Sequence, residues 1–220
     1  LYELGKSDIK NRAALYQALM DDPRINKKAI EILFHLGYFN KFAQPNRLIT
    51  EYEIYQKYIS AKVLTKSSFD DIMIDVIRPC CGKETEKQFR EIDNRALITA
   101  LIKQANIKPT TIVDRIKWQL EYLGYCTVSD PNSDPNDWLV LDIKTTGYGT
   151  VYCTLYNLCY GAERTYRANK KFWTNHQLSK GDVIRAVLQE KNKMKKDENG
   201  EWVVLSETYQ EMKVWKKLEV

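Results

Sequence analysis

The sequence predicts an α+β fold, in which a helical N-terminal region precedes a small C-terminal β-barrel. Apolar residues recur at spacings of three and four as far as about residue 125. The stretch Ser129 to Asp137 then contains two prolines and no apolar residue. After it the hydrophobic period changes from 3.6 to 2, which is typical of strands. We therefore expect a helical region at 1–128, a linker at 129–137 and a barrel at 138–220.

The start of the helical region is predicted to form a helical hairpin, a helix-hairpin-helix-like element over residues 7–42. Ser7 or Asp8 can cap the first helix, and Asp-Asp-Pro at 21–23 ends it. Asn26 can cap the second helix, and Gly37 stands where a left-handed C-terminal residue is needed. Two helices joined by so short a connection lie antiparallel or crossed.

The middle of the chain, from Leu48 to Tyr125, keeps a helical pattern of apolar residues. The pattern is weaker between Lys62 and Phe89, where Pro79-Cys80-Cys81-Gly82 indicates a turn. We expect this part to pack as a helical layer.

Motifs that carry chemistry are missing from the sequence. Asp70, Asp71 and Asp75 form the densest acidic group, but their helical spacing favours a solvated helix face or a cap over a metal site. There is no phosphate-binding P-loop, no G-x-S-x-G and no H-E-x-x-H. We therefore expect no catalytic residue and no enzyme activity in this chain itself.

Composition restricts the partners and the compartment. The chain has 34 Lys and Arg against 29 Asp and Glu, and the net charge of +5 suits a polyanion without requiring one. Five cysteines without a C-x-x-C pair, together with two histidines, argue against a zinc site and for reduced thiols in the cytoplasm. We expect no metal and no cofactor. The sequence contains neither a signal peptide nor an apolar run of about 18 residues, so we expect no membrane partner.

The C-terminal part is predicted to contain strands at 138–144, 150–157, 163–168, 182–190 and 201–205, with a last one near 209–217. A short helix at 170–177 fits between the third and fourth strands. This is the order of elements in an OB-fold, a small barrel that commonly binds single-stranded nucleic acids.

The second strand carries the main indication of function. In VYCTLY, alternation places Tyr152, Thr154 and Tyr156 on the face opposite Val151, Cys153 and Leu155. Exposed rings can stack on unpaired bases while nearby cations contact phosphates. The predicted nucleic-acid-binding residues of the barrel are Tyr152, Tyr156, Tyr166 and Trp173 for stacking, and Lys144, Arg164, Arg167, Lys170 and Lys171 for phosphate.

Other interpretations of this region stay open. Tyrosine is favoured in strands, and half of an antiparallel sheet commonly faces water without any ligand. The lysine-rich run Lys191 to Lys196 could extend the path of the bound nucleic acid, or it could serve solubility alone. We expect Trp202 and Trp215 in the core, because each lies within an alternating pattern.

Two sequence segments resemble a known protein family. The run INKKAIEILFHLGYFNKF, Ile25 to Phe42, resembles the helix-hairpin-helix region of bacterial C-family replicative DNA polymerases, the α subunit of DNA polymerase III. EYLGYCTVSDP, Glu121 to Pro131, resembles the sequence that precedes the OB domain in that family. In the first segment the matching residues are Asn26, Lys27, Lys28, Glu31, Leu33, Gly37 and Phe39.

The resemblance implies a DNA-directed DNA polymerase as the parent protein, whose OB domain holds single-stranded template DNA during replication. Polymerase chemistry would then belong to a palm with clustered carboxylates that this chain lacks. Residues 62–107 have no counterpart in the family pattern, and one interpretation is a lineage-specific insertion.

One departure from the family pattern concerns DNA contact. Helix-hairpin-helix elements usually bind phosphate through backbone N–H groups of a glycine-bearing turn. The turn here has no glycine, and Asp21 and Asp22 repel phosphate. Lys28, with Arg24 and Lys27, could still supply weak backbone contact beside the second helix, but core packing is the favoured role.

Two alternatives to DNA binding by a polymerase fragment stay open. The chain could be a protein-docking module of the replisome, for which QLEYL, Gln119 to Leu123, has the polar-then-apolar shape of a sliding-clamp peptide. It could also be a free-standing OB-fold protein that binds RNA or tRNA.

Overall fold

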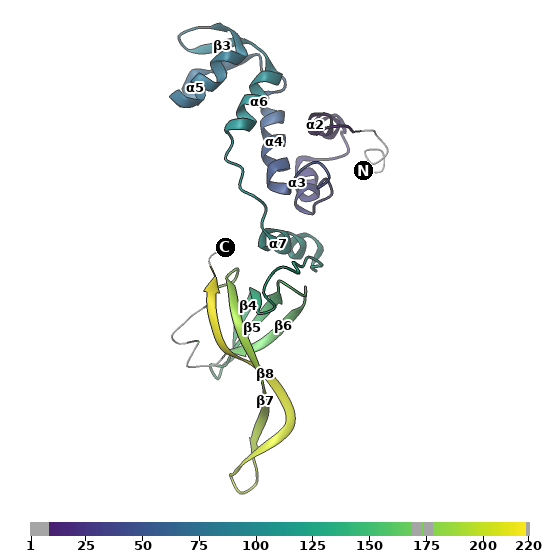
Figure 1. Ribbon diagram of the computed structural model, residues 1–220, viewed down its shortest axis with the longest axis vertical. Coiled ribbons are helices and arrows are strands. Elements are labelled where there is room, and N and C mark those ends of the chain that lie inside the picture. Colours follow the sequence, from purple (N-terminus) through teal and green to yellow (C-terminus); the bar gives the residue numbers. More distant parts are fainter. Residues whose placement is uncertain (1–8, 169–172, 174–177, 219–220) are drawn as a thin grey trace. The chain divides into compact units, whose positions relative to one another are not determined.

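The computed structural model describes residues 9–168, 173 and 178–218, with the side chains of 213–215 excepted (Figure 1). Helices come first and a β-barrel follows, so the predicted mixed α+β class is confirmed. The chain divides into two compact units, residues 1–111 and 112–220, which we call the helical unit and the barrel unit. Within the described residues, no helix combines the length and the apolar character needed to span a membrane.

The helical unit is organised around α4 (Pro45–Tyr58), which packs against α2 (Arg12–Asp21), α3 (Lys27–His35) and α6 (Asn94–Gln104). Pro45 opens α4, where its missing N–H costs nothing. Leu48, Tyr52 and Tyr55 then follow at spacings of three and four, and all three are buried. Tyr52 contacts Phe34 of α3 edge-on, with ring centroids 5.6 Å apart.

The predicted helical hairpin corresponds to α2 and α3. Asn26 caps α3 as predicted, because its side chain accepts a hydrogen bond from Ala29 N at 2.8 Å. Gly37 has φ of 78° beyond the end of α3, which also confirms the prediction. The first helix is capped by Asn11, whose side chain accepts from Ala14 N at 2.9 Å. Ser7 and Asp8, the predicted caps, lie outside the described residues.

The middle of the helical unit contains a three-stranded antiparallel sheet of order β1-β3-β2, which the sequence pattern did not predict. Its strands are β1 (Val63–Thr65), β2 (Cys81–Glu84) and β3 (Gln88–Ile92). Strands of three to five residues are too short to establish a period of two. The predicted turn at 79–82 is instead the 3₁₀ helix η2 (Arg78–Cys80) running into β2.

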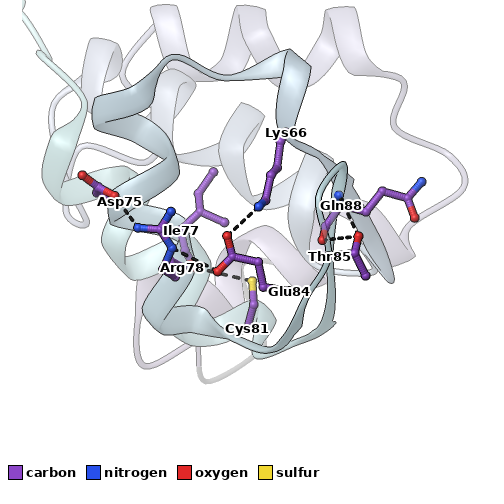
Figure 2. A network of polar contacts seen from close by, with 8 residues as sticks. All are labelled: Lys66, Asp75, Ile77, Arg78, Cys81, Glu84, Thr85 and Gln88. Carbon is purple, nitrogen blue, oxygen red and sulfur yellow. Dashed lines mark hydrogen bonds and ion pairs between the residues drawn. The ribbon is translucent and has the colours of Figure 1, made fainter.

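A network of ion pairs joins this sheet to α5 (Asp71–Ile77), as Figure 2 shows. Glu84 accepts hydrogen bonds from Lys66 at 2.5 Å and from Arg78 at 3.0 Å. Arg78 also donates to Asp75 at 2.5 Å. Asp70 caps α5 through Met73 N at 2.8 Å. The acidic group therefore has the capping and helix-face roles that its spacing predicted.

The barrel unit closes five strands in the order β4-β5-β6-β8-β7. All neighbours are antiparallel except β6 and β8, which pair in parallel through Arg167 and Ala168. The two strands predicted at 201–205 and 209–217 are one continuous strand. The bounds are β4 (Asp137–Thr145), β5 (Val151–Asn157), β6 (Glu163–Ala168), β7 (Val183–Lys196) and β8 (Trp202–Leu218).

The distal parts of β7 and β8 form a two-stranded hairpin that projects from the barrel (Figure 1). Trp202 lies near its tip, paired with Lys196, and is 63% exposed. The prediction that Trp202 belongs to the core is therefore wrong, because no third strand among the described residues pairs with the hairpin at this level. The side chain of Trp215 lies outside the described ones.

The barrel has a core on each side of its wall. Leu155, Cys153 and Tyr166 belong to the interior cluster. A second cluster lies on the outside, where Val113 and Ile116 of α7 (Ile112–Leu123) pack with side chains of β4, β5 and β7. The helix α7, predicted as part of the helical region, therefore belongs to the barrel unit.

The segment predicted as a linker, 129–137, is bonded to the barrel. Asp130 N donates to Leu158 O at 2.8 Å, and Ala186 N donates to Asn136 O at 3.0 Å. The buried side chain of Asn157 donates to Pro135 O at 2.7 Å. Polar residues suit this path because the segment is held by backbone hydrogen bonds and by ion pairs from Asp134 and Asp137 to Arg185 of β7. The division between the two units accordingly falls earlier, between residues 111 and 112.

Replacing Ile116 tests whether α7 stabilises the barrel. Ile116 is fully buried, so Ile116→Ala is expected to lower the free energy of unfolding of the barrel unit by about 2–5 kcal/mol. All five tryptophans lie in this unit, so tryptophan fluorescence during urea unfolding reports it selectively. Leu123→Ala, at an exposed position of the same helix, is the control and should cost less than about 1 kcal/mol. Equal effects of the two changes would contradict the packing.

The buried thiol of Cys153 predicts a loss of stability at alkaline pH. Burial raises the pKa of Cys153 from 9.0 to about 11, so the folded state keeps a proton that the unfolded state releases. This contribution to stability is complete below pH 9 and is lost as the pH rises towards 11. The stability difference between the wild type and Cys153→Ala should narrow above pH 9, by at most about 1.4 kcal/mol per pH unit. Urea unfolding of both proteins at several pH values measures this stability difference. A difference that stays constant with pH would refute the prediction.

Candidate nucleic-acid interface

The register of three neighbouring strands brings Lys144, Tyr152 and Arg167 into one row on the outside of the barrel. Lys144 on β4 is opposite Tyr152 on β5, and Tyr152 is opposite Arg167 on β6. Residues opposite one another in a sheet share a face. Tyr152 is 40% exposed, and Lys144 and Arg167 are exposed as well. We call this row the Tyr152 face.

The base of the projecting hairpin borders the Tyr152 face. The Arg167 guanidinium lies over the ring of Tyr209 on β8, 5.3 Å from its centroid. Lys193 on β7 has a raised pKa, caused first by its hydrogen bond to Glu207, and the nearby Tyr152 hydroxyl adds a smaller effect. Lys193 belongs to the lysine-rich run 191–196 noted in the sequence, whereas no sequence pattern marks Tyr209, which joins this surface only through strand pairing.

Most cations near the Tyr152 face already have an acidic partner. Lys144 lies 3.4 Å from Asp142, and Lys193 lies 2.6 Å from Glu207. Lys191 pairs with Glu211. Within the described part of the chain, Arg167 has no ion pair. A polyanion at this face would therefore meet one free guanidinium and several cations whose charge is partly compensated.

Two of the predicted stacking residues are buried, which corrects the prediction of an open tyrosine surface. Tyr156 faces outward as alternation predicted, but it is only 2% exposed because it lies in the cluster under α7. Its hydroxyl donates to Val128 O at 2.7 Å. Tyr166 is also 2% exposed, and it faces the barrel interior opposite Cys153. Neither ring is available for stacking on a base.

The remaining predicted residues of the barrel do not join the Tyr152 face. Arg164 is opposite Leu155 and so lies on the inner side of the sheet, at an exposed end of β6. Burial raises the pKa of Tyr166, and the nearby Arg164 opposes that rise. Trp173 is half-buried and packs against the interior cluster. Lys170 and Lys171 lie outside the described residues.

Lys28 belongs to the helical unit, where it lies exposed at the start of α3, 3.5 Å from Glu31. The turn before it is compensated internally, because Arg24 donates from two nitrogens to Asp22, each at 2.8 Å. These hydrogen bonds lower the pKa of Asp22 to about 2. Arg24 is thus engaged by the aspartate that was expected to repel phosphate.

The cysteines offer no chemistry at this site. Cys153 is buried in the barrel interior, and all five cysteines are free thiols. Among the residues that the structure describes, no group of three or more His, Cys, Asp or Glu side chains could hold a metal ion. The Tyr152 face therefore presents one aromatic ring, the Lys144 ammonium beside Asp142, and the Arg167 guanidinium, which has no ion pair among the described residues.

Comparison of the chain with protein-family models, curated proteins and solved structures finds no match.

Chemical nitration tests which tyrosines are accessible. Tyr148 is 98% exposed and Tyr152 40%, whereas burial both shields Tyr156 and Tyr166 and raises their pKa values. With tetranitromethane we expect Tyr148 to react first, Tyr152 next, and Tyr156 and Tyr166 only after unfolding. Mass spectrometry of proteolytic peptides measures the order. Nitration of Tyr156 in the folded protein at the rate of Tyr148 would contradict the burial under α7.

Proposed function

We propose that the chain binds single-stranded DNA through the Tyr152 face. The observation that carries the proposal is the exposed Tyr152 ring between Lys144 and Arg167 on three neighbouring strands. A base stacks on such a ring, and a guanidinium beside it bonds the adjoining phosphate. Because each base has a π face, this binding tolerates any sequence.

The strand order supports assigning the barrel to the OB-fold class. Numbered along the chain, its five strands are ordered 1-2-3-5-4, with the third and fifth parallel. OB-folds bind oligonucleotides at strands 2 and 3 and at the loops that join strands 1 to 2 and 4 to 5. Tyr152 and Arg167 lie on the second and third strands, and the projecting hairpin joins the fourth to the fifth.

The polymerase resemblance supplies the biological setting of the proposal. In that setting the parent protein is a DNA polymerase III α subunit, and the barrel holds unpaired template while other domains perform catalysis. The helical hairpin α2–α3 then acts chiefly by packing. Its turn supports this role, because Asp22 engages Arg24.

The charge pattern limits how strongly the face can hold DNA. Arg167 is the one cation of the Tyr152 face without an ion pair among the described residues, so we expect one or two phosphate contacts. The logarithm of the affinity should then fall with the logarithm of salt concentration at a slope of about −0.7 to −1.4. Weak binding of this kind suits a template DNA strand that must move past the site.

A protein-docking role is the second candidate, and the hairpin favours it. Met194, Trp202, Val203 and Val204 are all exposed near its tip, where a protein partner could cover them. The proposed clamp peptide is less favourable, since Gln119 accepts a hydrogen bond from Thr127 N at 2.8 Å and Leu120 packs in the outer cluster.

Replacing Tyr152 tests the DNA-binding proposal. Tyr152→Ala is expected to weaken binding of a labelled single strand of about 20 nucleotides by about 1–3 kcal/mol, because a stacking ring is lost. Tyr152→Phe should retain most of the affinity. Fluorescence anisotropy at two salt concentrations measures affinity and salt slope together, and the matching duplex should bind more weakly.

Tyr160→Ala is the matched control, because this tyrosine is also exposed but lies beyond the other end of β5. Equal loss in the two alanine variants would remove Tyr152 as the site. No binding of either strand form would favour the docking role. A preference for an RNA strand of the same sequence would favour the free-standing RNA-binding protein, because RNA differs by its 2′-hydroxyl.

A further inference from the structure

Buried Glu51 holds two arginines at the edge of a cleft in the helical unit. Glu51 on α4 is 2% exposed, and both of its carboxylate oxygens are engaged. Arg12 Nε donates to Oε2 at 2.6 Å, and Arg47 Nε donates to Oε1 at 2.7 Å. Tyr16 OH also donates to Oε2, at 3.0 Å. We call these four residues the Glu51 clamp.

The Glu51 clamp contains two guanidiniums and one carboxylate, so it carries a net positive charge. Some of its guanidinium N–H donors have no acceptor among the described residues. Each guanidinium bonds Glu51 through Nε, and its terminal nitrogens donate to no residue in the described part of the chain. The side chains of Arg12 and Arg47 are 39% and 50% exposed. A buried carboxylate that fixes two guanidiniums prepares them to bind an oxyanion without a large loss of side-chain entropy.

Two adjoining clefts meet at Arg12 and Phe42. The larger has a volume of about 1000 Å³ and the smaller about 410 Å³, and both lie within the helical unit. Among the described residues that line them, Glu51 is the one acidic residue. The cations that line the two clefts are Lys10, Arg12, Lys41, Arg47, Arg95 and Lys108.

The larger cleft combines this positive charge with an apolar wall. Ile59, Ile98 and Ile102 line it together with the ring of Phe42. Small-molecule sites in proteins are concave and largely apolar, with a few convergent polar groups, and have volumes of about 300–1000 Å³. A ligand matched to this lining carries a compact anion and a flat, weakly polar portion.

We propose that these clefts bind a nucleoside phosphate, with its phosphate at the free nitrogens of Arg12 and Arg47 and its base against the apolar wall. Arginine matches the geometry of phosphate oxygens and stays charged at all physiological pH values. Nucleotide binding here is independent of DNA binding by the barrel, because the described residues that line the clefts all belong to the helical unit.

Isothermal titration of the full chain with adenosine 5′-monophosphate and uridine 5′-monophosphate tests the proposal. At least one nucleotide should bind below about 1 mM. Adenosine and inorganic phosphate, each carrying half of the ligand, should each bind about tenfold more weakly or worse. The double variant Arg12→Gln/Arg47→Gln should lose about tenfold or more in nucleotide affinity.

Two further variants separate binding from folding, because the double variant leaves Glu51 buried without its cations. Arg95 lines the larger cleft and has no ion pair among the described residues, so Arg95→Gln should weaken nucleotide binding by about threefold without changing urea unfolding. Arg90→Gln, on β3 and outside both clefts, should change neither.

Three results would overturn the assignment. One is the absence of nucleotide binding up to about 5 mM. The second is equal affinity for inorganic phosphate and for the nucleotides, which would leave no role for the apolar wall. The third is that a 20-nucleotide strand binds but no mononucleotide does, and that Arg95→Gln weakens binding of the strand. This result would assign the clefts to the nucleic-acid backbone.

Discussion

Coverage of the outer barrel wall by α7 decides which aromatic rings this protein presents to solvent. Strand alternation separates the inside of a barrel from the outside, and it places both Tyr152 and Tyr156 outside. The outside is itself divided, because Val113 and Ile116 of α7 bury the part around Tyr156 and Leu139. The proposed site around Tyr152 exists because α7 ends its coverage before that part of β5.

The same packing explains the division of the chain. Since α7 and the segment that follows it bury apolar surface and satisfy backbone groups of the barrel, they form part of the barrel unit. A polar, proline-containing stretch is typical of a linker, yet here its backbone N–H and C=O groups form hydrogen bonds with the barrel, and the side chains of Asp134 and Asp137 pair with Arg185 of β7. Composition alone cannot separate a flexible linker from a polar segment that is fixed through its backbone.

In the helical unit, one buried carboxylate has a comparable organising role. Glu51 links the start of α2 to α4 through Arg12 and Tyr16, and its burial demands compensation by both arginines. No sequence pattern marks this group, because Arg12 and Glu51 are separated by 39 positions. Arg47 and Glu51 do have the spacing of a helical ion pair, but such pairs are usually solvated and carry no indication of a site.

Local chemistry by itself determined the helix caps at Asn26 and Gly37, the acidic capping group at Asp70, the order of a helical region before a barrel, and the positions of the first three barrel strands to within a residue or so. These features depend on neighbours a few positions apart, so the sequence contains all the information that they need. Only the tertiary structure decided the short sheet β1-β3-β2, the burial of Tyr156 and Tyr166, the exposure of Trp202 and the assembly of the Glu51 clamp. Each of these results from packing between segments far apart in the chain, where burial depends on what another element covers.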